Sequence, residues 1–61
     1  NPSADPIETA LALSAEASAL EDDGEWNRAG ELYLQSLTLF EAEDPGSPDV
    51  ANISLALGRI L

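Results

Sequence analysis

The sequence predicts an all-α fold, built as an antiparallel helical hairpin followed by a third helix. Apolar residues recur roughly every three or four positions through most of the chain, which is the period of a helix face. Turn-forming residues interrupt this pattern at Gly24 and again over 44–47. No segment of useful length alternates between apolar and polar residues with the two-residue period of a strand. Connections this short make neighbouring helices antiparallel.

The first helix is predicted over 6–22. Asp5 is placed to cap it, Pro6 suits the first helical position, and Glu8 lies three residues after the cap, as in a capping box. Gly24 then supplies the turn that folds the chain back. Small and apolar residues recur along one face of this helix: Ile7, Leu11, Ser14, Ala17 and Leu20.

The second helix is predicted over 25–43 and has the widest apolar face. Its central stripe consists of Trp26, Ala29, Tyr33, Leu37 and Phe40. Further residues widen this stripe on one side, namely Leu32, Ser36 and Leu39. At about 100° per residue the apolar arc covers about half of the circumference, more than on an ordinary surface helix. We therefore expect this helix to pack between two others, with Trp26 and Tyr33 in the core.

The third helix is predicted over 48–61. Ser47 is a suitable cap, and Pro48 takes the first helical position. Its apolar stripe consists of Val50, Ile53, Leu57, Ile60 and Leu61. Leu55 falls near the opposite face and should be exposed in an isolated three-helix unit. Ala29 and Gly58 are small enough to let a neighbouring helix backbone come close.

The composition excludes several classes of function. The chain has 61 residues, with 2 Lys+Arg against 12 Asp+Glu, for a formal net charge of -10. Such a chain repels nucleic acid and anionic membrane surfaces, so neither is an expected partner. It has no cysteine and no histidine, which argues against disulfides and zinc. Without His, Cys or Lys there is no standard nucleophile–base pair, so we expect no enzyme activity and no cofactor.

The chain shows no sign of a membrane segment or an export signal. No apolar stretch approaches the ~20 residues that a membrane span needs. A signal-peptide pattern is lacking too, which favours a cytoplasmic location. The chain begins at Asn1 and ends in the apolar residues of 58–61 without a capping signal. We therefore expect a fragment of a longer chain, or a unit whose open end is covered by another copy.

The segment 24–37 resembles a tetratricopeptide repeat (TPR), specifically the longer variant found in kinesin light chains and in many bacterial multidomain proteins. It matches the family pattern Gly-x-aromatic-x-x-Ala-x-x-Leu-Tyr-x-x-Ala-Leu, with Ser36 at the small Ala position. The Pro-Asp-Val-Ala of 48–51 matches the start of the next repeat in that variant, and Leu-Gly at 57–58 matches its following first helix. The resemblance covers 10–61, about one and a half repeats.

The resemblance implies a protein- or peptide-binding module, because the first helix of each TPR pair lines a concave surface. Carried over by position, the residues facing this groove are Leu11, Ser14, Ser18, Glu21, Asn52, Leu55 and Arg59. Asn52 could satisfy a peptide backbone and Arg59 a carboxylate; alternatively, both are ordinary solvated residues. The chain departs from the family at Glu16, where a large apolar residue is usual. Residues 55–56 are Leu-Ala in this chain. Kinesin-type repeats often have two asparagines at these positions, and those asparagines hold the backbone of a bound peptide.

The leading functional hypothesis is a protein–protein interaction or self-assembly module. A helical pair of this kind has an apolar flank that only a neighbouring repeat or chain can cover. The residues predicted to form that flank at the open end are Ile53, Leu57, Ile60 and Leu61. We expect a homo-oligomer, most simply a two-fold dimer in which two third helices pack together. The alternatives are a peptide-binding groove using Asn52 and Arg59, and a structural piece of a larger solenoid.

Overall fold

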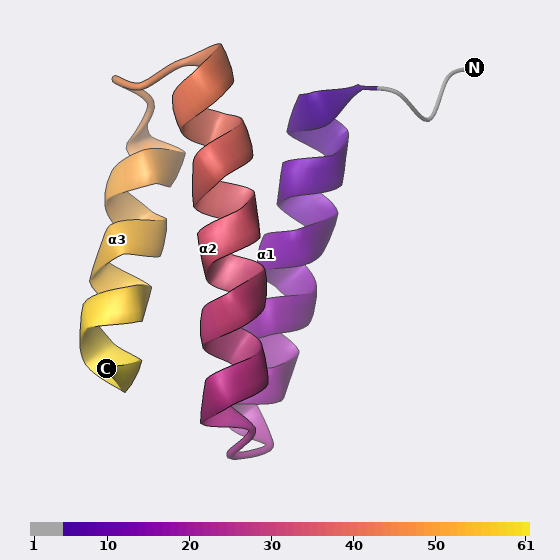
Figure 1. Ribbon diagram of the computed structural model, residues 1–61, viewed down its shortest axis with the longest axis vertical. Helices are drawn as coiled ribbons and strands as arrows, with labels where there is room; N and C mark the ends of the chain where they lie inside the picture. Colours follow the sequence, from indigo (N-terminus) through magenta and orange to yellow (C-terminus); the bar gives the residue numbers. More distant parts are fainter. Residues whose placement is uncertain (1–4) are drawn as a thin grey trace.

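The computed structural model describes residues 5–61, which form three helices (Figure 1). These are α1 (Pro6–Asp22), α2 (Trp26–Glu43) and α3 (Pro48–Ile60), and no strand occurs within that range. The predicted all-α fold is confirmed, and each predicted helix end lies within one residue of the observed one. Asn1, the first residue of the expected fragment, lies outside the described residues.

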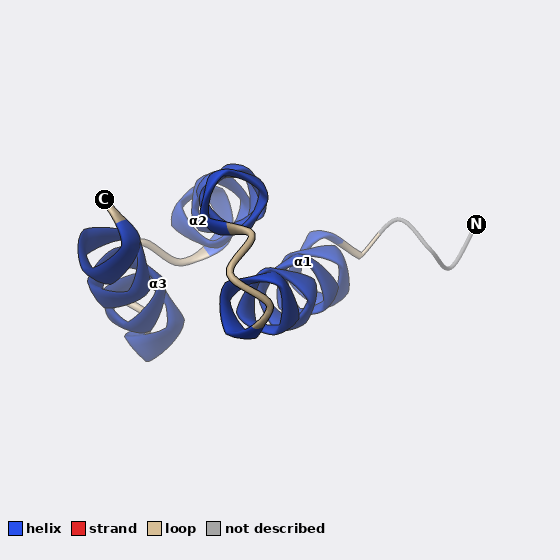
Figure 2. Ribbon diagram, turned by 90° about the horizontal axis from the view of Figure 1, so that it is seen from below, coloured by secondary structure: helices blue, strands red, loops and turns tan. Residues whose placement is uncertain are grey.

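Helix α2 lies between the other two helices and packs against both of them. Successive helices run in opposite directions, so that α1 and α3 flank α2 on its two sides (Figures 1 and 2). The arrangement is flat, with principal extents of 33 × 25 × 13 Å. The expectation that the widely apolar helix is sandwiched is therefore confirmed.

The starts of α1 and α3 are set by local side-chain caps. The Asp5 carboxylate accepts a hydrogen bond from the Ile7 N–H at 3.0 Å, and the Ser47 side chain accepts one from the Val50 N–H at 3.4 Å. A proline follows each cap, at a position where the helix needs no N–H donor. Both predicted caps are confirmed.

The turn between α1 and α2 depends on a glycine. Gly24 has a φ of 81°, in the left-handed region that other residues avoid. Its N–H donates to the carbonyl of Glu21 at 3.0 Å, and the Glu25 N–H donates to the carbonyl of Leu20 at 2.9 Å. This pair of bonds is a Schellman motif, which satisfies the last carbonyls of α1. The chain can therefore reverse within a few residues.

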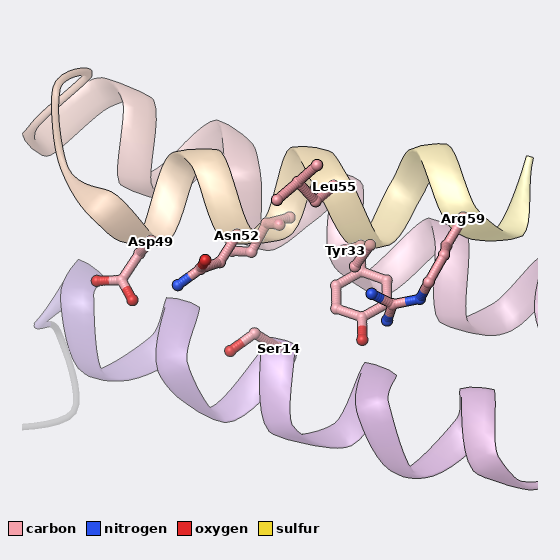
Figure 3. Close-up of a pocket in the computed structure, with 8 residues that line it drawn as sticks. Ser14, Tyr33, Asp49, Asn52, Leu55 and Arg59 are labelled. Carbon is pink, nitrogen blue, oxygen red and sulfur yellow. The ribbon is translucent and has the colours of Figure 1, made fainter.

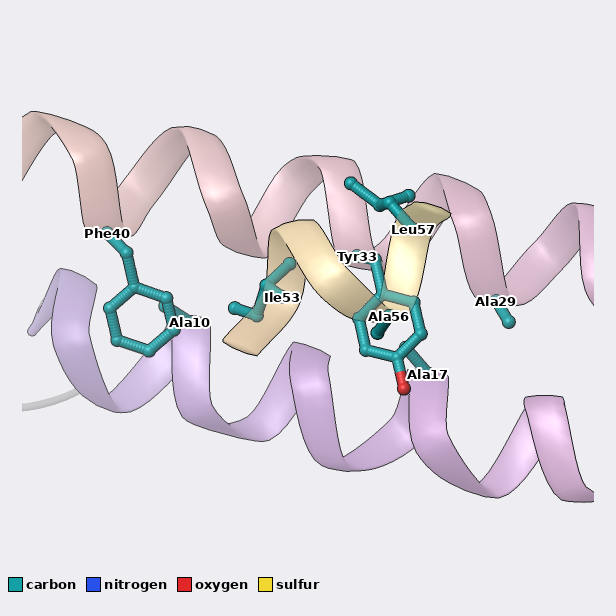
Figure 4. Close-up of a cluster of buried hydrophobic side chains, with 8 residues drawn as sticks. All are labelled: Ala10, Ala17, Ala29, Tyr33, Phe40, Ile53, Ala56 and Leu57. Carbon is teal, nitrogen blue, oxygen red and sulfur yellow. The ribbon is translucent and has the colours of Figure 1, made fainter. Parts of the chain in front are cut away.

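The core is thin and unusually rich in small side chains (Figure 4). Its buried hydrophobic members are Ala10, Ala17, Ala29, Tyr33, Phe40, Ile53, Ala56 and Leu57. Alanines at the contact let α1 and α2 approach closely. Ser36, which is also buried, donates its hydroxyl hydrogen to the Ala10 carbonyl at 2.8 Å and so links α2 to α1. Sequence reasoning treated Ser36 only as a small residue and missed this bond.

The prediction that Trp26 lies in the core was wrong, although Tyr33 is buried as expected. Trp26 is 52% exposed. It is the first residue of α2, and its side chain lines a shallow hollow beside Gly30 and Ile60 instead of lying between α1 and α2. At that end of the hairpin the other helices do not enclose it.

The prediction of a close helix contact at Gly58 was also wrong. A β-carbon built on Gly58 would meet nothing within 4 Å, whereas one built on Gly30 would lie 3.7 Å from Cδ1 of Ile60. Gly30 is buried on the side of α2 that faces α3. The glycine that brings two helices together is therefore Gly30.

Candidate functional site

One candidate site is a groove between α1 and α3, with α2 as its floor (Figure 3). It has a volume of about 330 Å³. Side chains from all three helices line it: Ser14, Tyr33, Asp49, Asn52, Ile53, Leu55, Ala56 and Arg59. The groove therefore combines apolar side chains of α3, namely Ile53, Leu55 and Ala56, with polar groups from all three helices.

The groove brings together four of the residues that the TPR resemblance assigned to it, namely Ser14, Asn52, Leu55 and Arg59. Leu11 and Ser18 are exposed on α1 but do not line this groove. Asp49 does line it and was missed. The available signal was its spacing, because Asp49, Asn52 and Ala56 recur at the three- and four-residue steps of one helix face.

Arg59 is already paired within the chain. Its Nη2 lies 3.0 Å from Oε2 and 3.2 Å from Oε1 of Glu21, and its Nε donates to Oε2 at 3.2 Å. The Tyr33 hydroxyl donates to Oε1 of Glu21 at 3.0 Å. The Glu21 carboxylate therefore joins α1, α2 and α3. The expectation of an Arg59 free to receive a ligand's carboxylate needs this correction, since a ligand would have to displace Glu21.

This network shifts the pKa of two of its members. The hydrogen bonds from Arg59, and secondly from Tyr33, lower the pKa of the Glu21 carboxyl below its ordinary value. Burial, followed by the hydrogen bond to Glu21, raises the pKa of the Tyr33 hydroxyl. Both shifts favour the ionised carboxylate next to a neutral phenol, which is the arrangement that the hydrogen bonds require.

We predict that Glu21 stabilises the folded protein at neutral pH and that this contribution is lost in acid. Because its pKa is lower in the folded state, its contribution to stability is present above the unfolded pKa, near 4.5, and is lost as pH falls through the folded pKa. Wild type should therefore exceed Glu21→Gln in free energy of unfolding at neutral pH, and the difference should shrink in acid. Urea unfolding from neutral pH to about pH 3 measures it.

Glu16→Gln is the matched control, because it removes one negative charge from an exposed position on the same helix. Its effect on the free energy of unfolding should be smaller than that of Glu21→Gln at neutral pH. A difference between wild type and Glu21→Gln that does not change with pH would contradict the role of the Glu21–Arg59 pair.

A second candidate site is an apolar edge on the opposite side of α3, where α3 lies beside α2. We define the apolar edge as Trp26, Leu34, Ile60 and Leu61, which surround Gly30 and line one hollow. Leu34 is 54% exposed and Leu61 is 95% exposed, while Ile60 is half-buried. Contiguous large apolar side chains that remain exposed in this way are characteristic of interaction surfaces.

The apolar edge differs in part from the predicted open flank. Ile60 and Leu61 belong to it, but Ile53 and Leu57 are buried in the chain's own core. The stripe of α3 faces α2, although Ile53 still lines the α1–α3 groove and Leu57 lines the hollow at the apolar edge. Leu55 is exposed, as predicted. Sequence reasoning missed Leu34, although its four-residue spacing from Gly30 places the two on the same side of α2.

Two classes of site receive no support from residues 5–61. That range contains no group of three or more side chains that could hold a metal ion. None of its helices is long and apolar enough to cross a membrane. Comparison of the chain with protein-family models, curated proteins and solved structures found no match.

Proposed function

We propose that this chain is a protein–protein interaction or self-assembly module of the TPR type. The observation that carries the proposal is the apolar edge, where Trp26 is half-exposed beside Leu34 and Leu61. Each buried Å² of apolar surface contributes about 25 cal/mol, so covering this edge stabilises the covered state. The chain functions by presenting this edge to another polypeptide, and a second copy, which would give a homo-oligomer, is one partner to test.

The TPR assignment rests on the match over 24–37, and the helical hairpin is consistent with it. Gly24 forms the reversal between two antiparallel helices, and the small Ala29 is buried at their contact. α3 then packs beside α2, as the first helix of a following repeat would. In a repeat of this kind each helical pair depends on a neighbour to cover its flank.

Tryptophan fluorescence tests the proposal directly, because Trp26 is the chain's single tryptophan. Association through the apolar edge should shift its emission to shorter wavelength as the indole leaves water. The shift should accompany a rise in mass by sedimentation, whether the partner is a second copy or one of the helical peptides described below. Leu55→Ala, on the opposite side of α3, should leave the emission shift and the rise in mass unchanged. Emission that stays that of a hydrated indole with every partner would contradict the proposal.

A second candidate function is peptide binding in the α1–α3 groove. It is favoured by the mixed lining of that groove, where the polar side chains of Asn52 and Ser14 lie near apolar side chains of α3. Since Glu21 occupies Arg59, a peptide carboxylate must compete with Glu21. Arg59→Ala should weaken peptide binding without loss of helix content, and Glu21→Gln should strengthen it. Unchanged affinity in both variants, measured by calorimetry, would remove this candidate.

A further inference from the structure

We infer that the apolar edge receives a single basic amphipathic helix from another protein, in preference to a second copy of this chain. The inference rests on the proposed function, since it names the partner of the surface described above. Two properties of the edge support it: its relief and its charge.

The relief of the edge suits one helix. Trp26, Gly30 and Leu34 lie on successive turns of α2, so two large side chains stand on either side of a position with no side chain. Ile60 and Leu61 at the end of α3 close the other side of this hollow. A helix laid along α2 and α3, which run side by side (Figure 1), can pack its apolar side chains between Trp26 and Leu34 and against Ile60, which lies over Gly30. This is the helix-in-groove mode of recognition.

The charge of the edge selects a basic partner. Glu31 lines the hollow, and Glu25 directly precedes Trp26. Neither arginine lines this hollow: Arg59 is paired with Glu21, and Arg28 lines a neighbouring hollow between α1 and α2, which Glu31 also lines. A second copy would oppose one net charge of -10 to another, which costs association free energy. Lysine or arginine residues flanking the apolar stripe of a partner helix would instead face Glu31.

The test uses the full chain and three synthetic peptides of about 18 residues. The first has leucines at helical period with lysines on both flanks, the second has glutamates in place of the lysines, and the third keeps the lysines but scrambles the leucines. Trp26 emission and calorimetry report binding. We expect only the first peptide to shift the emission, and its affinity to fall at least tenfold between about 50 and about 500 mM NaCl.

Variants locate the contact. Leu34→Ala should weaken binding of the first peptide about tenfold, and Glu31→Gln should weaken it about threefold at low salt but much less at high salt. Leu55→Ala is the matched control and should bind as wild type does. Circular dichroism should show the helix content of wild type in all three variants, because each changes an exposed position.

The remaining outcomes separate this inference from the proposed function. Self-association that shifts Trp26 emission and strengthens with added salt would overturn the inference and support the proposed module, with a second copy as its partner. If the ordered and scrambled basic peptides bound equally well and neither changed Trp26 emission, the binding would be charge attraction alone, and the inference would be overturned. If no peptide and no protein concentration moved the emission, both the inference and the proposed function would fail.

Discussion

Phe40→Ala should remove most of the stability of this protein. Phe40 is 2% exposed and is the largest fully buried side chain in residues 5–61. Replacing a buried phenylalanine with alanine costs about 3–5 kcal/mol, through lost burial and the cavity left behind. A chain of 61 residues has a total stability of roughly 3–9 kcal/mol. We therefore expect a large loss of helical circular dichroism, or a transition that begins in very low urea.

Leu34→Ala is the matched control for Phe40→Ala, since it truncates a large apolar side chain on the same helix. Leu34 is half-exposed, so its loss should change the free energy of unfolding by less than about 1 kcal/mol. Comparable losses in the two variants would mean that α2 does not present Phe40 to the core and Leu34 to solvent.

The ends of the helices were predictable because local residues set them. A cap acts through a hydrogen bond to a backbone group two or three residues away, as Asp5 and Ser47 do here. Gly24 acts through its own backbone conformation. None of these effects depends on how the helices pack, and so the sequence alone predicts them.

The orientation of particular side chains was less predictable. Periodicity shows which residues share a helix face, but not how far along that face the neighbouring helix covers it. Trp26 and Tyr33 lie on the same stripe, yet only Tyr33 is enclosed by other helices. Ile53 and Leu57 illustrate the converse error, since their stripe was expected to remain open and is covered by α2.

The Glu21–Arg59 pair could not have been derived from sequence spacing. The two residues are 38 positions apart and meet only because α1 and α3 flank the same helix. With 12 acidic residues available to two arginines, no local rule selects Glu21. Assigning both residues to the concave groove placed them on one surface, but it did not predict that they bind each other.

The second large effect is expected at the contact between α1 and α2, where Ala17→Leu should destabilise the fold. Ala17 is fully buried, and the core around it includes the large side chain of Tyr33 as well as further alanines (Figure 4). Extra carbon atoms in a packed core cost about 1–3 kcal/mol because they force neighbouring helices apart. For a domain of this size the midpoint of thermal unfolding should fall by roughly 5–20 °C. Thermal unfolding followed by circular dichroism measures it.

Ala15→Leu separates packing from helix propensity in this experiment. It makes the same chemical change on the same helix, but Ala15 is exposed, so the midpoint should move by only a few degrees, as for other surface changes. Leucine and alanine both favour helices, so propensity cannot account for a large difference between the variants. Equal thermal midpoints for Ala15→Leu and Ala17→Leu would mean that α1 does not pack against α2 through its alanines. The close α1–α2 contact that positions Glu21 beside Tyr33 would then be wrong.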